Sequence, residues 1–189
     1  MKRVIWLVAM VSLFLAGCFL PEKFESKVDI QKDGSYTLSY DGTIAYAPAL
    51  NRKISAKDEK KLESMVKDIK KDPNIKEAKY LGNARYQITM LQKKKAGEKA
   101  YFFDKRANII SVIPNGKSIT ISTKKLAKRD LAAIKKLNFK VDGKIVVSIP
   151  DNMKFEGTKP DSTPTLGFGN YEWNIDSFDK SINIKVVPK

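Results

Sequence analysis

The spacing of hydrophobic and polar positions changes along the chain, and these changes predict its first elements. Residues 24–46 form two alternating runs around Lys32-Asp33-Gly34-Ser35, where Asp-Gly accepts the positive φ angles of a tight hairpin. Within residues 56–70, which follow a capping Ser55, apolar positions recur at i, i+3, i+4 and i+7: Leu62, Met65, Val66 and Ile69. The pattern therefore predicts a β-hairpin followed by an amphipathic helix.

The remainder of the chain has mostly strand patterns. Alternating runs cover residues 75–81 and 85–92, and Asn115-Gly116 marks the turn of a second hairpin. A second helix is predicted over residues 124–137, where apolar residues recur near a period of 3.6. Beyond it, strands separated by a polar segment rich in Gly, Pro and Thr are predicted at residues 139–149, 171–175 and 182–187. We therefore expect an α+β fold, a predominantly antiparallel β-sheet with about two helices packed on it.

The first residues of the chain follow neither pattern. Lys2 and Arg3 precede an apolar stretch over residues 4–15, and two small residues come next, which is the layout of a secretory signal. This stretch is too short to cross a bilayer, because a transmembrane helix needs about 20 apolar residues. We therefore predict a signal peptide at residues 1–17 that is removed on export.

The single cysteine of the chain comes directly after this signal. The residues Leu15-Ala16-Gly17-Cys18 resemble the lipobox of bacterial lipoproteins. The resemblance implies a diacylglyceryl group on the Cys18 sulfur, cleavage just before Cys18, and a further acyl chain on the new amino terminus. Two or three acyl chains anchor a protein stably, whereas a single chain binds only marginally. We therefore expect a lipid-anchored protein of the bacterial cell envelope. In a cell with two membranes, Phe19 in place of Asp favours the outer membrane, at its periplasmic or surface face.

Removal of the signal leaves a chain long enough for one well-cored domain. A hydrophobic content of 42% and an aromatic content of 10% are typical of a globular protein. With no second cysteine, the exported chain can form no internal disulfide, so its core alone must hold the fold. We expect residues 18–23 to form a lipidated tether and residues 24–189 to form a single α+β envelope domain.

The chain is strongly basic, with 36 Lys and Arg residues against 21 Asp and Glu and a net charge of +15. Only five of the 36 basic residues are Arg, which dominates specific phosphate and base recognition, so the composition argues against a nucleic-acid partner. A solvated, Lys-rich surface explains this charge, and attraction to an anionic lipid or envelope polymer is the alternative. The densest run is our candidate for anionic-surface binding: Lys93, Lys94, Lys95 and Lys99.

Few residues suggest catalysis. The chain has no histidine, which excludes Ser-His and Cys-His nucleophiles and every His-containing zinc site. We therefore expect a protein that is not an enzyme and has no metal and no cofactor. Two carboxylate pairs keep open the alternative of a histidine-independent envelope hydrolase: Glu156/Asp161 and Asp176/Asp179.

Two aromatic residues near the C-terminus are candidates for ligand stacking. Tyr171 and Trp173 share one strand face because they are two residues apart, so they either pack in the core or offer a stacking surface. The stretch "NYEWNIDSF" with the following "INIKVV", the opening "KVDIQKDGSYTLSYDGTI" and the helix between them resemble the LppM-like lipoprotein domain. The resemblance implies an α+β envelope module with a lipid or glycolipid ligand. We predict a membrane-anchored, non-catalytic domain that binds a lipid, an envelope polymer or a partner protein.

Overall fold

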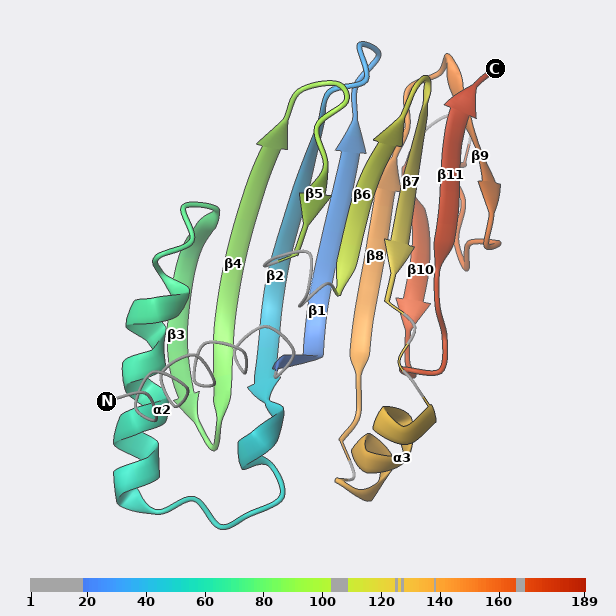
Figure 1. Cartoon of the computed structure of the whole chain (residues 1–189). Coiled ribbons are helices and arrows are strands. Elements are labelled where there is room, and N and C mark those ends of the chain that lie inside the picture. Colours follow the sequence, from blue (N-terminus) through green and yellow to red (C-terminus); the bar gives the residue numbers. More distant parts are fainter. Residues whose placement is uncertain (1–18, 103–108, 125, 127, 138, 166–168) are drawn as a thin grey trace, which may run out of the picture.

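The computed structural model describes residues 19–102, 109–124, 126, 128–137, 139–165 and 169–189. This part of the chain forms two β-sheets, two α-helices and a short 3-10 helix (Figure 1). The fold class is therefore α+β, as the sequence predicts. Strands from all parts of the chain contribute to the sheets, but they divide into two sheets where the sequence pattern indicated one.

The larger sheet has six strands in the order β10-β8-β1-β2-β4-β3. Its strands are β1 (Phe19–Ile30), β2 (Tyr36–Tyr46), β3 (Ile75–Gly82), β4 (Arg85–Lys94), β8 (Asp142–Ser148) and β10 (Tyr171–Ile175). All neighbouring strands in this sheet are antiparallel except β1 and β8, which are parallel. The hairpin predicted around Asp33-Gly34 is confirmed as the β1–β2 pair.

The smaller sheet has five antiparallel strands in the order β5-β6-β7-β11-β9. Its strands are β5 (Ala100–Tyr101), β6 (Ile110–Asn115), β7 (Ser118–Thr123), β9 (Met153–Gly157) and β11 (Asn183–Pro188). The hairpin predicted at Asn115-Gly116 is confirmed as the β6–β7 pair. Strand β9 lies between the predicted strands at residues 139–149 and 171–175, where the sequence pattern predicted no strand.

Three helical segments complete the described elements: η1 (Ala47–Ala49), α2 (Ala56–Ile69) and α3 (Lys128–Lys136). The Ser55 hydroxyl accepts a hydrogen bond from the Asp58 backbone N–H at 3.2 Å, which confirms the predicted cap of α2. Helix α2 packs beside β3 and buries Leu62 and Ile69. No helix in the described part of the chain is long and apolar enough to cross a membrane.

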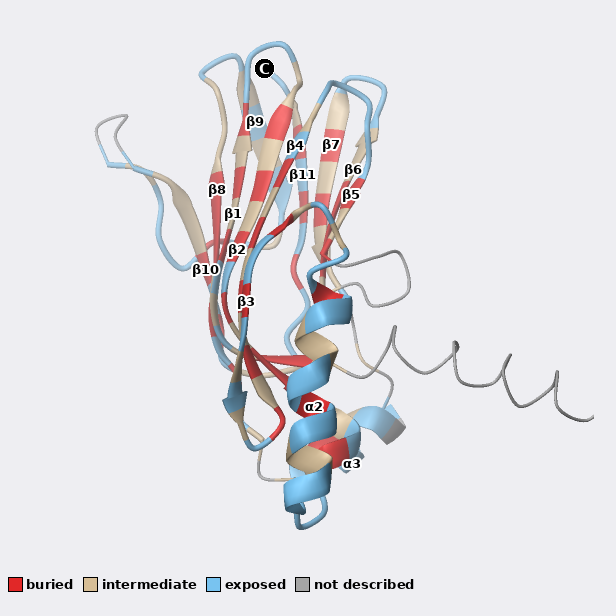
Figure 2. Ribbon diagram, turned by 90° about the vertical axis from the view of Figure 1, so that its left-hand side faces the viewer, coloured by how far each residue is buried: buried red, intermediate tan, exposed pale blue. Residues whose placement is uncertain are grey.

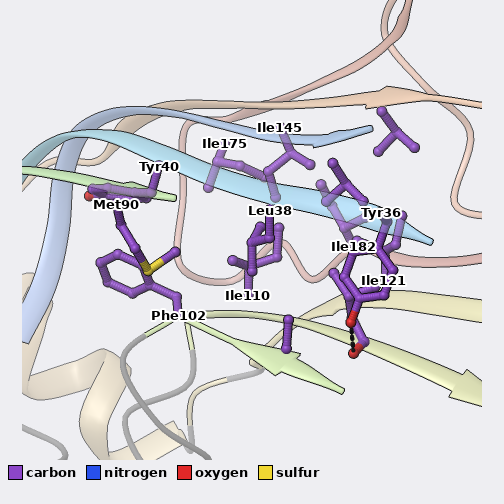
Figure 3. Packing of buried hydrophobic residues seen from close by; sticks show 14 of the residues in the cluster. Tyr36, Leu38, Tyr40, Met90, Phe102, Ile110, Ile121, Ile145, Ile175 and Ile182 are labelled. Carbon is purple, nitrogen blue, oxygen red and sulfur yellow. Dashed lines mark hydrogen bonds between the residues drawn. The ribbon is translucent and has the colours of Figure 1, made fainter. Parts of the chain in front are cut away.

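The main hydrophobic core lies between the two sheets. Figure 2 shows buried positions where the sheets face each other, and exposed positions on the outer sides of the helices. Figure 3 shows Leu38 and Tyr36 of β2 directed toward Ile110 and Ile121 of the smaller sheet, while Tyr40 lies beside Phe102. One continuous cluster of buried side chains therefore joins both sheets.

The first strand begins earlier than we expected. Residues 19–23, which we expected in a tether, are the first residues of β1. Phe19 packs against Tyr46 and Tyr86, with ring centroids 5.5 Å and 5.7 Å away, because the β1–β2 register places Phe19 opposite Tyr46. Residues 1–18, which include the whole predicted signal peptide and Cys18, lie outside the described residues.

Strand register defines two ends of the molecule, which we call the Phe19 end and the Ile30 end after the first and last residues of β1. At the Phe19 end, Tyr46 leads directly into η1, Ala45 pairs with Arg85 and Lys23 pairs with Asp142. At the Ile30 end, Ile30 pairs with Tyr36, which in turn pairs with Lys94. Loops distant in sequence therefore meet at one of these two ends.

Candidate functional site

A cleft with aromatic walls lies where the two sheets meet at one side of the sandwich. Strands β9 and β10 are edge strands of different sheets, and β8 lies next to β10. The cleft between these three strands has a volume of about 270 Å³. Its apolar lining consists of Val147, Ile149, Pro150, Met153, Phe155, Pro164 and Tyr171. We call this space the aromatic cleft.

Two half-buried rings define the aromatic cleft. The rings of Phe155 on β9 and Tyr171 on β10 meet edge to face, with centroids 4.6 Å apart. Phe155 also meets Trp173 edge to face at 6.0 Å, so it contacts both aromatic residues of β10. Edge-to-face contacts of this kind are favourable because the positive ring edge faces the negative ring face. The contacts hold the two half-buried rings in place in the wall of the cleft.

Tyr171 and Trp173, the two predicted stacking residues, have different surroundings. Trp173 is only 2% exposed, and its indole N–H donates to the Thr158 carbonyl oxygen at 3.0 Å. Its ring is therefore part of the core and presents no face to a ligand. Tyr171 is half-buried and lines the aromatic cleft. Ligand stacking thus stays a prediction for Tyr171, whereas the packing of Trp173 is a correction to our expectation.

Polar groups surround the mouth of the aromatic cleft. Lys154 and Lys189 contribute two cations, and Asp151 and Ser148 contribute oxygen atoms. Lys154 lies 3.5 Å from Glu156, an exposed ion pair that contributes little to stability. The Ser148 hydroxyl donates to the Asn170 side-chain oxygen at 2.5 Å. The cleft is therefore lined by both apolar and polar groups, and two exposed lysines lie at its rim.

The carboxylate pairs that suggested a hydrolase have local partners. Asp161 accepts a hydrogen bond from the Asn174 backbone N–H at 2.7 Å, and it is exposed like Glu156. Asp179 pairs with Lys135 at 3.2 Å, and Asp176 lies 3.9 Å from Lys180. Within the described ranges, no group of three or more side chains could hold a metal ion. Asp176 and Asp179 both line a small pocket of about 120 Å³ beside α3, where each lies next to a lysine.

The predicted anionic-surface lysines lie at the Ile30 end. Lys93 and Lys94 are the last residues of β4, and Lys94 is opposite Tyr36 at the start of β2. Lys95 and Lys99 follow in the turn that leads to β5, and both are exposed. The run is therefore at the opposite end of the sheet from Phe19 and from the predicted lipid anchor. Binding by these lysines stays a prediction.

Sequence reasoning missed Phe155, the second ring of the aromatic cleft. Its strand, β9, is a five-residue edge strand with the sequence MKFEG, too short and too polar for a clear alternating pattern. Strand β9 pairs with β11, and this long-range pairing places Phe155 opposite Val186. A single aromatic residue between Lys154 and Glu156 was the only available signal, and it predicts no particular partner.

Comparisons with known proteins give a distant structural likeness. The chain matches no protein-family model, and no curated protein matches it in sequence. Its fold is similar to the NMR structure of the folded domain of the Mycobacterium tuberculosis LppM protein, with a TM-score of 0.38 and 9% sequence identity. The match covers 93% of this chain and 94% of that chain. A likeness this distant transfers neither a ligand nor an activity.

Proposed function

We propose that this protein is a membrane-anchored envelope lipoprotein whose domain binds the apolar part of an anionic amphiphile in the aromatic cleft, without catalysis. The observation that carries the proposal is the half-buried Phe155–Tyr171 pair in the wall of a cleft that has Lys154 and Lys189 at its rim. Small-molecule sites are usually concave and combine hydrophobic and aromatic walls with a few polar groups that fix the ligand's orientation.

The dimensions and charges of the cleft support an acyl chain as the bound group. Its volume of about 270 Å³ is slightly below the usual range for sites that enclose a drug-sized ligand. Part of one chain therefore fits better than a whole lipid. The two rim lysines suit an anionic head group that stays in water while the chain enters between Phe155 and Tyr171.

Tryptophan fluorescence offers a direct test of the cleft. The chain has two tryptophans, and Trp6 leaves with the predicted signal, so Trp173 is the only one in the mature protein. Trp173 contacts Phe155, and bromine quenches indole emission at short range. We expect a fatty acid with bromine on its chain to quench Trp173 saturably. We expect Tyr171→Ala to weaken this binding about tenfold, since aromatic contact area is lost.

Tyr101→Ala, on β5 at the other side of the smaller sheet, is the matched control and should bind like the unsubstituted protein. Equal quenching of both variants, or no quenching of the unsubstituted protein, would contradict a lipid site in this cleft. If an anionic polysaccharide without acyl chains changes the fluorescence of Trp173 and the fatty acid does not, the ligand is instead a polymer.

The anchor has its own measurement. We expect the intact mass of the chain from bacterial membranes to show loss of residues 1–17 and gain of acyl groups on Cys18. Cys18→Ser should retain residues 1–17 and carry no acyl mass. A mature chain without acyl groups would exclude the lipid anchor and leave the test of the cleft unaffected.

A further inference from the structure

The start of β1 leaves no free linker between the predicted lipid and the folded domain. Phe19 already pairs with Tyr46 and packs against Tyr86. Phe19 directly follows Cys18 in the sequence, and consecutive Cα atoms are about 3.8 Å apart. If Cys18 is acylated as proposed above, the Phe19 end of the domain must lie at the bilayer surface.

Parts of the Phe19 end extend beyond Phe19 itself. In Figure 1, η1, the following loop and α3 all lie farther along the molecule than the start of β1. Register explains this arrangement, because η1 follows Tyr46 directly and the chain enters β8 at Asp142, opposite Lys23. These segments are therefore the first parts of the domain to meet a surface at this end.

Exposed lysines lie on both sides of this end. Lys53 and Lys57 lie on the loop before α2 and on its first turn, and Lys136 and Lys140 lie at and after the end of α3. Within the described ranges, these four side chains have no ion pair. Acidic side chains at this end include Asp58 and Asp179, which already pair with Arg52 and Lys135. Asp142 and Asp176 are also exposed there, so the lysines are only partly balanced.

An apolar side chain is exposed at the same end. Among the described residues, Leu81 is the large hydrophobic side chain that is exposed, at 48%. It lies beside the β3–β4 turn, where the Glu59 carboxylate accepts hydrogen bonds from Tyr80 and from the Asn83 backbone N–H. The turn is held to α2 by these bonds, so the exposure of Leu81 belongs to an ordered hairpin.

The lysines of the Ile30 end are too far away to share this surface. Lys94 aligns with Tyr36 and hence with Ile30, eleven residues beyond Phe19 on β1. At about 3.3 Å per residue, that separation is roughly 36 Å. The Debye length at physiological ionic strength is only about 8 Å, so headgroups at the Phe19 end do not attract Lys94.

We infer that the Phe19 end is a membrane-contact surface, on which Lys53, Lys57, Lys136 and Lys140 lie over anionic lipid headgroups and Leu81 enters the interface. This inference rests on the proposed acylation of Cys18, because the anchor is what brings the Phe19 end to the bilayer. Its chemistry, cations around an exposed leucine, suits an anionic bilayer without any acyl chain on the protein.

Vesicle co-sedimentation tests this surface with the anchor removed. The protein is the chain of residues 18–189 with Cys18→Ser, which contains every described element. The vesicles are phosphatidylcholine alone or mixed with phosphatidylglycerol, at low and physiological salt. We expect binding to the mixed vesicles only, and weaker binding at higher salt. Replacing the four lysines by Gln should weaken it by at least about tenfold.

The matched control has the same charge change at the other end: Lys93, Lys94, Lys95 and Lys99 replaced by Gln. We expect this variant to bind within about twofold of the unsubstituted chain, since its charges lie outside the Debye length. If the two variants lose vesicle binding to the same extent, binding depends on net charge alone and not on the position of the lysines. A larger loss for the control would place the surface at the Ile30 end, and either result overturns the inference.

A fluorophore locates the contact directly, because the Cys18→Ser chain has no other cysteine. A polarity-sensitive dye on Leu81→Cys should shift to shorter wavelength with anionic vesicles, and the same dye on Asn115→Cys, in the β6–β7 turn, should not. No shift at position 81 would also contradict the inference. If the intact mass shows no acyl groups, the protein has no lipid anchor. The vesicle measurements would still test the membrane-contact surface, because they use the chain without acyl groups.

Discussion

At the residue scale, close packing around Phe24 explains two glycines. The β1–β2 pairing shifts register between Pro21 and Phe24, and Gly42 lies opposite this irregularity. A Cβ atom on Gly42 would be 2.3 Å from the Lys23 carbonyl oxygen and 2.5 Å from the Phe24 Cα. The Phe24 ring stacks on Tyr40 and fills the space where Gly143 would carry a side chain. The absence of a Cβ lets β1 bend within the sheet.

Gly42→Ala should therefore be strongly destabilising. Backbone atoms cannot move aside as a flexible side chain can, so we expect a loss of about 2–3 kcal/mol in the free energy of unfolding, measured with denaturant. Gly97→Ala is the control. Gly97 has a positive φ of +82°, and Gly42 has a φ of +156°, but at Gly97 no atom lies within 4 Å of the added Cβ. Backbone strain alone should cost about 1 kcal/mol there. Equal losses at the two positions would contradict the packing explanation.

At the element scale, helix α2 shows how a short sequence signal becomes a complete cap. Asp58 accepts hydrogen bonds from the Ser55 hydroxyl at 2.8 Å and from the Ser55 backbone N–H at 3.3 Å. These bonds to Ser55 also hold the pKa of Asp58 below its usual range. Together with the bond from the Asp58 N–H to the serine oxygen, they form a capping box. The first turn of α2 is thereby closed.

Ser55→Ala should cost about 1 kcal/mol of the free energy of unfolding, because the orphan N–H groups of the first turn lose an acceptor. The matched control is Ser64→Ala in the same helix, where the exposed serine hydroxyl bonds only to the Lys61 carbonyl oxygen at 2.7 Å. Alanine has the higher helix propensity, so this change should be neutral or stabilising by a few tenths of a kcal/mol. Denaturant unfolding of both variants checks the prediction, and a neutral Ser55→Ala would contradict it.

At the scale of the whole molecule, tyrosine hydroxyls join the layers. Tyr36 of the larger sheet donates to the Glu98 carbonyl oxygen at 2.6 Å and approaches the Val112 carbonyl oxygen of the smaller sheet at 3.4 Å (Figure 3). Tyr86 donates to the Leu62 carbonyl oxygen of α2 at 2.8 Å. Tyr40 lies between Phe24 and Phe102, with ring centroids 5.4 Å and 4.2 Å away. Burial raises the pKa of all three tyrosines above the usual value.

Raised tyrosine pKa values predict a loss of stability in alkali. A tyrosine in the unfolded chain has a pKa of about 10. Below that pH the phenols are protonated in both the folded and the unfolded state, so the free energy of unfolding is not reduced by their titration. Above pH 10 the unfolded chain releases them first, so the free energy of unfolding falls as pH rises toward the folded pKa. Denaturant unfolding from pH 8 to pH 12 checks this. The Tyr40→Phe chain should lose less stability over the same range, although lysine deprotonation affects both proteins equally. Parallel curves for the two proteins would contradict the prediction.

Local features of this protein could be read from its sequence. The turn residues Asp33-Gly34 and Asn115-Gly116 define two hairpins, because few residues accept their backbone angles. Ser55 and the apolar spacing after it define α2, because capping and amphipathicity act within a few residues. The predicted signal at residues 1–17 and the lipobox-like residues that end at Cys18 are likewise local patterns, and from them the sequence alone predicts an anchor.

Long-range pairing determined the remaining features. Parallel pairing of β1 with β8, the division of the strands into two sheets and the place of β9 beside β11 each join segments distant in the chain. These pairings put Phe155 against Tyr171, bury Trp173, and place Lys94 and Phe19 at opposite ends of the sheet. Alternation shows which residues share a strand face, but it does not name the partner strand, because every strand offers the same backbone hydrogen bonds. The tertiary structure therefore decided which side chains line the aromatic cleft and which lysines lie at the Phe19 end, next to the predicted anchor.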